Sequence, residues 1–338
     1  MTALVLDLRK TMFMNSRVLP ALALAATLAA PAWAQVPNDA FSGFPGTRIR
    51  CAPAETGRAL LGADDEWMAA TSPFQRQAVM QSATPVTLET FRSWNADAAR
   101  PWTPGFQARW RKALENVAPA FAALRIPLPP EVWLVASNGQ ESADAPYTRA
   151  NAVFLPEQMK LPGYTDEMLI AHELWHVASR HAPALATRLY AEIGFEPMPA
   201  LAFPQQWTAA RIANPDAPGN RHAMRLTIEG RQVLVTPVLV ASRLELKPGE
   251  NFFSVMEPRL LEVQPDGPVS RAVLRDGQPL WHPLAGPHDY LRRLGGNTRY
   301  VIHYEEAMAD NVALLVTGLP ARNPALLEKL RAALLAAR

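Results

Sequence analysis

The chain has 338 residues, of which 49% are hydrophobic and 8% aromatic. This composition is typical of a globular protein that can bury a sizeable core, and it excludes a disordered or fibrous chain. Lys and Arg number 33 against 31 Asp and Glu, and the chain has no long basic run, so its charge gives no support for nucleic-acid binding.

Residues 1–34 predict a secretory signal peptide. They have a short basic start around Met14 and Arg17, an apolar run over 18–30, and the small-x-small pattern of a cleavage site at 32–34. Met14 is a possible true start, because the leader then has the usual length. The apolar run is shorter than the roughly 20 residues that span a bilayer, which argues against an uncleaved anchor. We expect a periplasmic or secreted protein with no stable membrane span after cleavage.

After the leader, the chain predicts a single α+β domain. Residues 35–125 are expected to form a helical and irregular layer. The strongest helix in it covers 104–124, since its apolar residues recur with helical spacing, and Pro119 is expected to kink or end that helix. The other expected elements of the first half are a helix near 72–83 and two strands, at 131–137 and 149–156.

The second half begins with a helix over 165–181, whose start Thr165 can cap. From 224 to 275 the chain becomes rich in Val, Leu, Phe and Thr around Gly and Pro. This pattern predicts two or three β-hairpins and makes about 220–290 a β-rich segment. The remaining expected elements are a strand that passes into a helix over 297–318, ending near Gly318, and a terminal helix capped by Asn323 with Pro324 at its first position.

The stretch LIAHELWHVASRH, residues 169–181, carries two histidines four positions apart with a glutamate between them. On a helix, His172 and His176 lie on one face, so both imidazoles can reach one cation. Glu173 lies one step round the helix, where it can approach a water molecule and act as a general base. The helix is otherwise apolar, and burying three polar side chains without a partner is costly. The pattern therefore favours a metal site over an ordinary amphipathic helix.

A catalytic zinc site normally has three protein ligands, and two glutamates are candidates for the third. Glu196 lies between a glycine and a proline, and proline disfavours a helix just before it. Glu306 is favoured, because Asp310 follows on the same helical face and can accept a hydrogen bond from the far nitrogen of a ligand histidine. His181 is one residue away from the position of a third histidine ligand, so we expect it at the surface.

The motifs HELWH and EEAMADN together resemble the gluzincin, or thermolysin-like, zinc metallopeptidases, which have H-E-x-x-H followed by E-x-x-x-D. The resemblance implies a zincin-like fold in which a small mixed sheet covers the active-site helix. The expected fold also has a helical part below the active-site helix, and it contains the β-rich segment as an insertion. The implied cofactor is Zn²⁺. The implied site residues are His172, His176 and Glu306 as zinc ligands, Glu173 as general base and Asp310 as the partner of His172.

The resemblance also implies residues that contact the substrate. NAVF, residues 151–154, is similar to the segment at the sheet edge that pairs with an extended peptide, so Asn151 and Ala152 are expected to bind the substrate backbone. A Tyr or His from outside the motifs stabilises the oxyanion in this family. His288 and Tyr290 are the preferred candidates, with an ordinary surface loop as their alternative. The other candidates are His282, Tyr300 and His303.

Residues 35–338 are therefore expected to form one zinc metallopeptidase domain that acts on a peptide or protein substrate. One alternative is a zinc hydrolase that acts on a non-peptide amide, such as one in cell-wall material. Another is an envelope binding protein with a purely structural zinc, which requires a further His or Asp to close the site. His303, one turn before Glu306, makes this second alternative conceivable.

Overall fold

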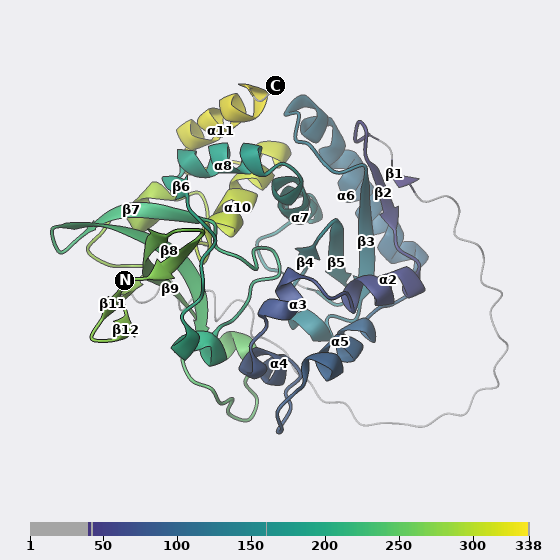
Figure 1. The fold of residues 1–338 in the computed structure, drawn as a ribbon. Coiled ribbons are helices and arrows are strands. Elements are labelled where there is room, and N and C mark those ends of the chain that lie inside the picture. Colours follow the sequence, from purple (N-terminus) through teal and green to yellow (C-terminus); the bar gives the residue numbers. More distant parts are fainter. Residues whose placement is uncertain (1–39, 42, 160, 337–338) are drawn as a thin grey trace.

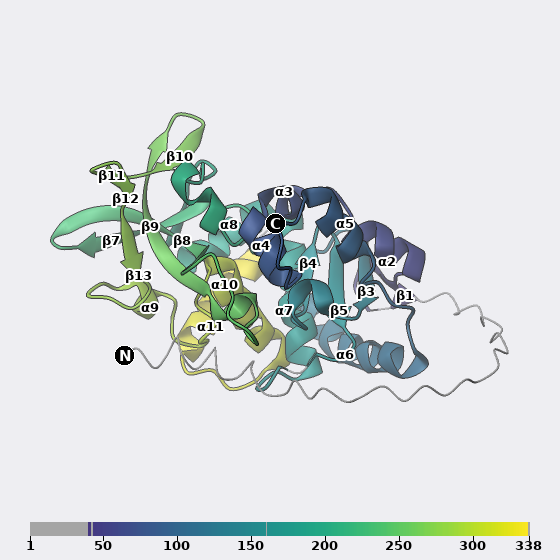
Figure 2. The same cartoon turned by 90° about the horizontal axis from the view of Figure 1, so that it is seen from below.

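The computed structural model describes residues 40–336, apart from 42 and 160. Within them the chain is a mixed helix-and-strand protein, with its two main sheets on opposite sides of a pair of buried helices (Figures 1 and 2). The expected signal peptide, residues 1–34, lies outside the described residues. No helix in the described part is both long and apolar enough to cross a membrane.

The first sheet has five strands in the order β1-β2-β3-β5-β4. Their bounds are Ala40–Phe41 for β1, Arg48–Cys51 for β2, Glu131–Ser137 for β3, Tyr147–Arg149 for β4 and Ala152–Pro156 for β5. The three central strands are parallel, and the two edge strands are antiparallel to their neighbours. Both expected strands are present, as β3 and β5, whereas β1 and β2 lie in the layer that was expected to be helical and irregular.

Helices pack around this sheet, and α6 (Pro104–Ala123) is the longest of them in the described chain. Pro119 lies inside α6 and does not end it. Because Val117 and Phe121 on either side of it are buried, packing outweighs the hydrogen bond that proline cannot donate. The shorter helices are α2 (Ala54–Leu61), α3 (Glu66–Ala70), α4 (Pro73–Val79), α5 (Leu88–Ala96) and the 3-10 turn η1 (Gln140–Ser142).

The second sheet has six strands, in the order β10-β9-β8-β7-β6 with β13 also paired to β9. All pairings in it are antiparallel. Its strands are β6 (Phe195–Pro197), β7 (His222–Ile228), β8 (Arg231–Ala241), β9 (Met256–Asp266), β10 (Val269–Ala272) and β13 (Trp281–Pro283), and a separate hairpin joins β11 (Leu274–Arg275) to β12 (Gln278–Pro279). The 3-10 turns η2 (Gln205–Ala210) and η3 (Phe252–Ser254) lie in the loops of this half.

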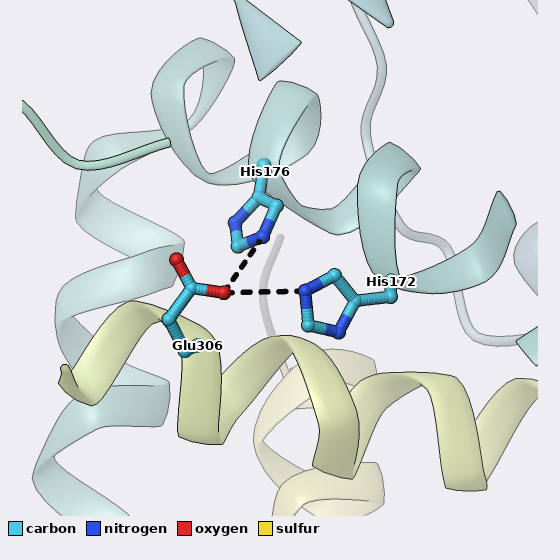
Figure 3. A group of neighbouring side chains, drawn as sticks. All are labelled: His172, His176 and Glu306. Carbon is cyan, nitrogen blue, oxygen red and sulfur yellow. Dashed lines mark hydrogen bonds and ion pairs between the residues drawn. The ribbon is translucent and has the colours of Figure 1, made fainter. Parts of the chain in front are cut away.

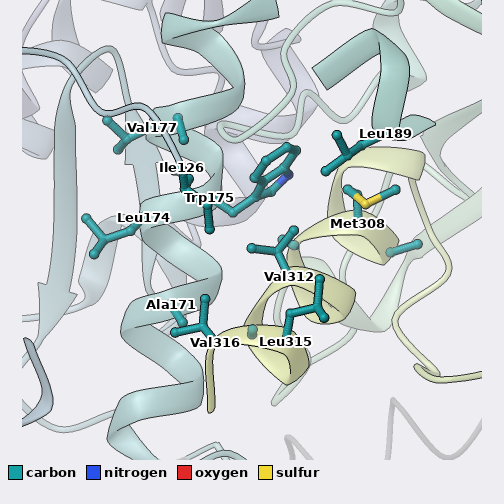
Figure 4. Packing of buried hydrophobic residues seen from close by; sticks show 14 of the residues in the cluster. Ile126, Ala171, Leu174, Trp175, Val177, Leu189, Met308, Val312, Leu315 and Val316 are labelled. Carbon is teal, nitrogen blue, oxygen red and sulfur yellow. The ribbon is translucent and has the colours of Figure 1, made fainter. Parts of the chain in front are cut away.

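Helices α7 (Asp166–His181) and α10 (Tyr304–Thr317) pack side by side between the two sheets. Their apolar side chains interlock at the centre of the main core, where Trp175 of α7 faces Met308 and Val312 of α10 (Figure 4). Each such buried side chain contributes about 1.5–3 kcal/mol. The remaining helices are α8 (Pro183–Glu192), α9 (Tyr290–Arg293) and α11 (Pro324–Ala336).

Residues 297–303, which precede α10, are irregular, so the expected strand there is wrong. Polar side chains of this segment bond to the helices instead of pairing with a strand. Asn297 donates to the Asn311 side chain over 2.9 Å, and the Thr298 hydroxyl donates to Asp310. The helix itself ends as expected at Gly318, whose φ of 67° is the left-handed conformation that glycine adopts readily.

Candidate metal centre

Side-chain caps define where α7 and α10 begin. The Thr165 hydroxyl accepts a hydrogen bond from the Met168 backbone N–H over 3.1 Å, as expected. His303 caps α10, since its Nδ1 accepts from the Glu305 backbone N–H over 3.2 Å. Both helices are buried along most of their length. Polar side chains between them are therefore cut off from water and must find partners on the facing helix.

His172, His176 and Glu306 converge between the two helices (Figure 3). The Nε2 atom of His172 lies 3.2 Å from Oε2 of Glu306, and the Nε2 atom of His176 lies 3.4 Å from the same oxygen. One ligand atom from each residue lies within 4.8 Å of the other two. The two histidines expected on one face of α7 thus meet the expected glutamate, and the group can hold a metal ion.

Each histidine has a carboxylate of its own on α10. The Nδ1 atom of His172 lies 2.8 Å from Oδ1 of Asp310, and the Nδ1 atom of His176 lies 2.8 Å from Oε1 of Glu305. Such a carboxylate keeps the proton on Nδ1 and leaves the Nε2 lone pair for a metal. Asp310 thus contacts the histidine that was expected, while the role of Glu305 was missed.

Further hydroxyl groups hold these two carboxylates in place. The Tyr164 hydroxyl donates to both oxygens of Asp310, over 2.8 and 3.0 Å. The Ser179 hydroxyl donates to Oε1 of Glu305 over 2.6 Å, and the Tyr190 hydroxyl donates to Oε2. The oxygens of Asp310 and Glu305 therefore already accept hydrogen bonds from hydroxyl groups, which hold both carboxylates in the position that orients the histidines.

Burial and neighbouring charged groups shift the pKa values of His172 and Glu306 in opposite directions. Burial lowers the pKa of His172, but hydrogen bonds with Asp310 and Glu306 outweigh it and raise the pKa to about 10. Burial raises the pKa of Glu306, but the charge of His176 and the bonds to both histidines bring it well below the usual value. Burial and the nearby Asp216 raise the pKa of Glu173 to about 8. With these pKa values, protons on the histidines and on Glu173 balance the negative charge of the carboxylates, a role that a bound cation would otherwise have.

Two buried atoms of the group have no hydrogen-bond partner. These are the Nε2 atom of His176 and the Oε2 atom of Glu173. Their residues are 0% and 3% exposed, so bulk water does not satisfy them. A carboxylate oxygen of Glu173 lies within 4.8 Å of a His176 ring nitrogen, and this arrangement fits a cation and a water molecule. The donor set of two imidazoles and one carboxylate suits zinc.

A loop before β7 lies against the same centre. The Asn214 side chain donates to Oε1 of Glu306 over 2.5 Å. An Asp216 carboxylate oxygen lies within 4.8 Å of ligand atoms of Glu173 and His176, which makes a second group that can hold a metal ion. Burial raises the pKa of Asp216. The loop is anchored beside Asn214, where Gln75 both donates to and accepts from the Ala213 backbone, over 3.0 and 2.8 Å.

The expected position of NAVF at the sheet edge is wrong. Its strand, β5, pairs with β3 on one side and β4 on the other, so Asn151 and Ala152 do not face an open edge. The Asn151 side chain donates to the Glu131 backbone carbonyl over 2.9 Å, and Ala152 is 0% exposed. The edge strand is β4, where the Thr148 backbone N–H bonds to Asp216 over 2.7 Å. A separate strand β4 was not expected, so the edge was placed one strand inward.

The preferred oxyanion candidates do not contact the cluster. Tyr290 is 0% exposed, and its hydroxyl bonds to the Val301 carbonyl over 3.4 Å. His288 bonds to the Pro283 carbonyl and His282 to Glu262, each over 3.1 Å. Tyr300 is different, because its ring stacks on His172 with 6.1 Å between ring centroids. Among the five candidates it is the one whose ring contacts a member of the described cluster.

The remaining candidates lie away from the cluster. Glu196 is exposed on β6 and pairs with Arg225 over 2.7 Å. His181 is exposed at the end of α7, as expected. His303 is used as the cap of α10, and its Nε2 lies 3.3 Å from the Asn220 side chain. Asp216 has a carboxylate oxygen within 4.8 Å of a His176 ring nitrogen, so Asp216, and not His303, is the candidate for a fourth metal ligand.

Sequence reasoning missed Asn214 and Asp216 because they lie in a proline-containing loop, NPDAP, without helical or strand spacing. Glu305 was visible as the neighbour of Glu306. However, the step between adjacent residues on a helix is about 100°, so its pairing with His176 depended on the orientation of α10.

Comparison of the chain with protein-family models, with curated proteins and with solved structures finds no match.

Proposed function

We propose that this chain is a zinc metallopeptidase with a zincin-like fold, similar in mechanism to the gluzincins and acting in the periplasm or outside the cell. One observation carries the proposal. Two Nε2 atoms and one Glu306 oxygen converge in a buried site, and a carboxylate oxygen of Glu173 lies within 4.8 Å of a His176 ring nitrogen. The mixed sheet against α7 is compatible with this fold, in which β6 to β13 form an insertion.

The residues of the centre have distinct roles in this proposal. His172, His176 and Glu306 would hold the cation, which would act as a Lewis acid and lower the pKa of a bound water molecule to roughly 7. Asp310 and Glu305 retain the Nδ1 protons, so both histidines present Nε2.

Glu173 takes the proton of the attacking water and delivers it to the leaving amine. Its Oε2 atom is free for this purpose, since it has no partner in the structure. Tyr300, which stacks on His172, is the best-placed donor to the oxyanion.

Glu173→Gln tests the mechanism. The variant keeps all three ligands, so we expect an unchanged zinc content by metal analysis. Hydrolysis of a mixed peptide library should fall by about 10²–10⁴-fold, because the general base is lost. Hydrolysis at the wild-type rate would refute this mechanism. Cell-wall fragments assayed beside the peptides distinguish a peptidase from a hydrolase of non-peptide amides.

The second candidate function is a binding protein with a structural zinc, and Asp216 is the observation in its favour. A carboxylate within 4.8 Å of His176 can complete a four-ligand site with no open position. In that case wild-type protein binds zinc but hydrolyses nothing, and Asp216→Ala binds zinc more weakly because one of four ligands is lost. In a peptidase, Asp216 is not a ligand, so Asp216→Ala keeps the zinc affinity of wild type.

A further inference from the structure

A pocket lies beside the candidate metal centre, with a volume of about 610 Å³ that includes its opening to solvent. Its lining includes Asn214 and Asp216, which adjoin Glu306 and His176, and Tyr300, which stacks on His172. A substrate group in this pocket therefore has its reactive bond close to the centre. The mechanism above leaves the pocket without a role.

The walls of the pocket are largely aromatic and aliphatic. Trp67, Tyr147, Phe252 and Tyr300 belong to the lining, together with aliphatic residues such as Leu239. An apolar stem of a substrate side chain gains from this burial. The faces of aromatic rings also attract cations, since their π systems are negative at the face.

Three polar side chains of the lining have buried atoms that make no well-formed hydrogen bond. Glu141 is 2% exposed, and neither of its carboxylate oxygens makes a well-formed hydrogen bond. The Ser142 hydroxyl and the Tyr147 hydroxyl are also buried without a well-formed hydrogen bond, although Arg149 lies near the Tyr147 hydroxyl and opposes the rise that burial causes in its pKa. Burial raises the pKa of Glu141, and the nearby Ser137 hydroxyl only partly opposes this. Three polar groups without well-formed hydrogen bonds among the lining of one pocket are expensive for a folded protein and are characteristic of a ligand site.

The charged residues of the lining are all acidic. Glu141 and Asp216 are its charged residues, and the lining contains no Lys, Arg or His. Oδ1 of Asp216 accepts both hydrogen bonds from Thr148, whereas neither oxygen of Glu141 makes a well-formed hydrogen bond, so Glu141 is the carboxylate with both oxygens open to a ligand. A cation with several N–H donors complements all three unpaired groups, because a carboxylate and two hydroxyls can each accept.

We propose that this pocket binds an organic cation on an apolar stem, with Glu141 as its counter-ion. For a peptide substrate that cation is the ammonium or guanidinium of a Lys or Arg side chain, or the ammonium of the peptide's own amino terminus. The inference rests on the proposed function, because it gives a peptidase at this centre a preference for basic substrates.

Calorimetric titration of metal-free protein tests the pocket apart from catalysis. Three probes separate the sources of the cation. Nα-acetyl-lysine amide has a cationic side chain, norleucine amide has only the α-ammonium, and Nα-acetyl-norleucine amide has the same type of stem without charge. We expect one or both cations to bind about tenfold or more tightly than the neutral probe. Equal affinities for all three, or no binding, would overturn the proposal.

Glu141→Gln removes the counter-ion with little change in volume. The preference for the cation should then disappear, while thermal unfolding shows whether the variant is folded. Asp144→Asn is the matched control, since it removes an exposed acid from the same turn that does not line the pocket. A cation preference that survives in Glu141→Gln, or is lost equally in Asp144→Asn, refutes the role of Glu141.

The outcomes also separate this inference from the proposed function. If the zinc-loaded protein cleaves peptides without regard to basic residues and the metal-free protein has no cation preference, the peptidase stands and the pocket proposal fails. If the cation binds but no peptide is cleaved, the pocket stands and the peptidase fails.

Discussion

The carboxylate of Asp216 accepts hydrogen bonds from both the backbone N–H and the hydroxyl of Thr148, each 2.7 Å long. Thr148 is the middle residue of β4, the edge strand beside the metal centre. An extended peptide that adds to a sheet uses the backbone groups of such an edge. Asp216 therefore competes with a substrate for the same donor, and it does so within reach of His176.

Asp216→Ala is expected to open this edge. The variant should lose about 1–3 kcal/mol of unfolding free energy, because the buried Thr148 N–H is left unpaired. A peptide hydroxamate should bind the zinc-loaded variant more tightly than wild type, as measured by titration. Asp216→Asn is the control, since its amide oxygen still accepts from Thr148 and the edge stays closed. A weaker hydroxamate affinity in Asp216→Ala contradicts the competition.

Glu306→Ala should lose zinc, because a site with two histidines lacks its third ligand. Glu196→Ala should retain zinc, since Glu196 is exposed and pairs with Arg225. Metal content after dialysis against a weak chelator measures both. Zinc loss in the Glu196 variant alone would reverse the assignment.

Asp310→Asn and Glu305→Gln test the carboxylates that orient the histidines. Each variant should lower zinc affinity by about 10–100-fold while the three ligands remain. Competition with a fluorescent zinc chelator measures the change. An unchanged affinity in both variants would show that the tautomer of His172 and His176 does not depend on these groups.

The contribution of His222 to the unfolding free energy should fall as the pH decreases from about 6.5 toward 4. Burial lowers the pKa of His222 from 6.5 to about 4. In that window the unfolded chain binds a proton at His222 that the folded chain does not, so acid favours unfolding.

The contribution of His222 is about 1–3 kcal/mol, and His222→Gln should remove it from the pH dependence of thermal unfolding. His181→Gln, which changes an exposed histidine, should leave the acid sensitivity unchanged. The same acid sensitivity in His222→Gln as in wild type would assign the effect to other groups.

Features that depend on residues close together in the chain could be predicted from the sequence. The spacing of His172 and His176 determines that they share a face once α7 forms, and Thr165 caps that helix through its own hydroxyl. The same holds for Glu306 and Asp310 on α10, which contact the same histidine. Helix periodicity alone relates these pairs, because each is four residues apart.

Relationships between distant segments needed the tertiary structure. The orientation of α10 decides that Glu305 meets His176 while its neighbour Glu306 meets both histidines. Strand pairing decides that β5 is interior and that β4 forms the edge. The loop with Asp216 has no periodicity from which its contact with Thr148 could be inferred.

The sequence by itself thus determined which residues can share a helical face, since backbone hydrogen bonds set that spacing locally. Only the tertiary structure decided which faces meet, because packing of the whole core selects among the many pairings that local structure allows.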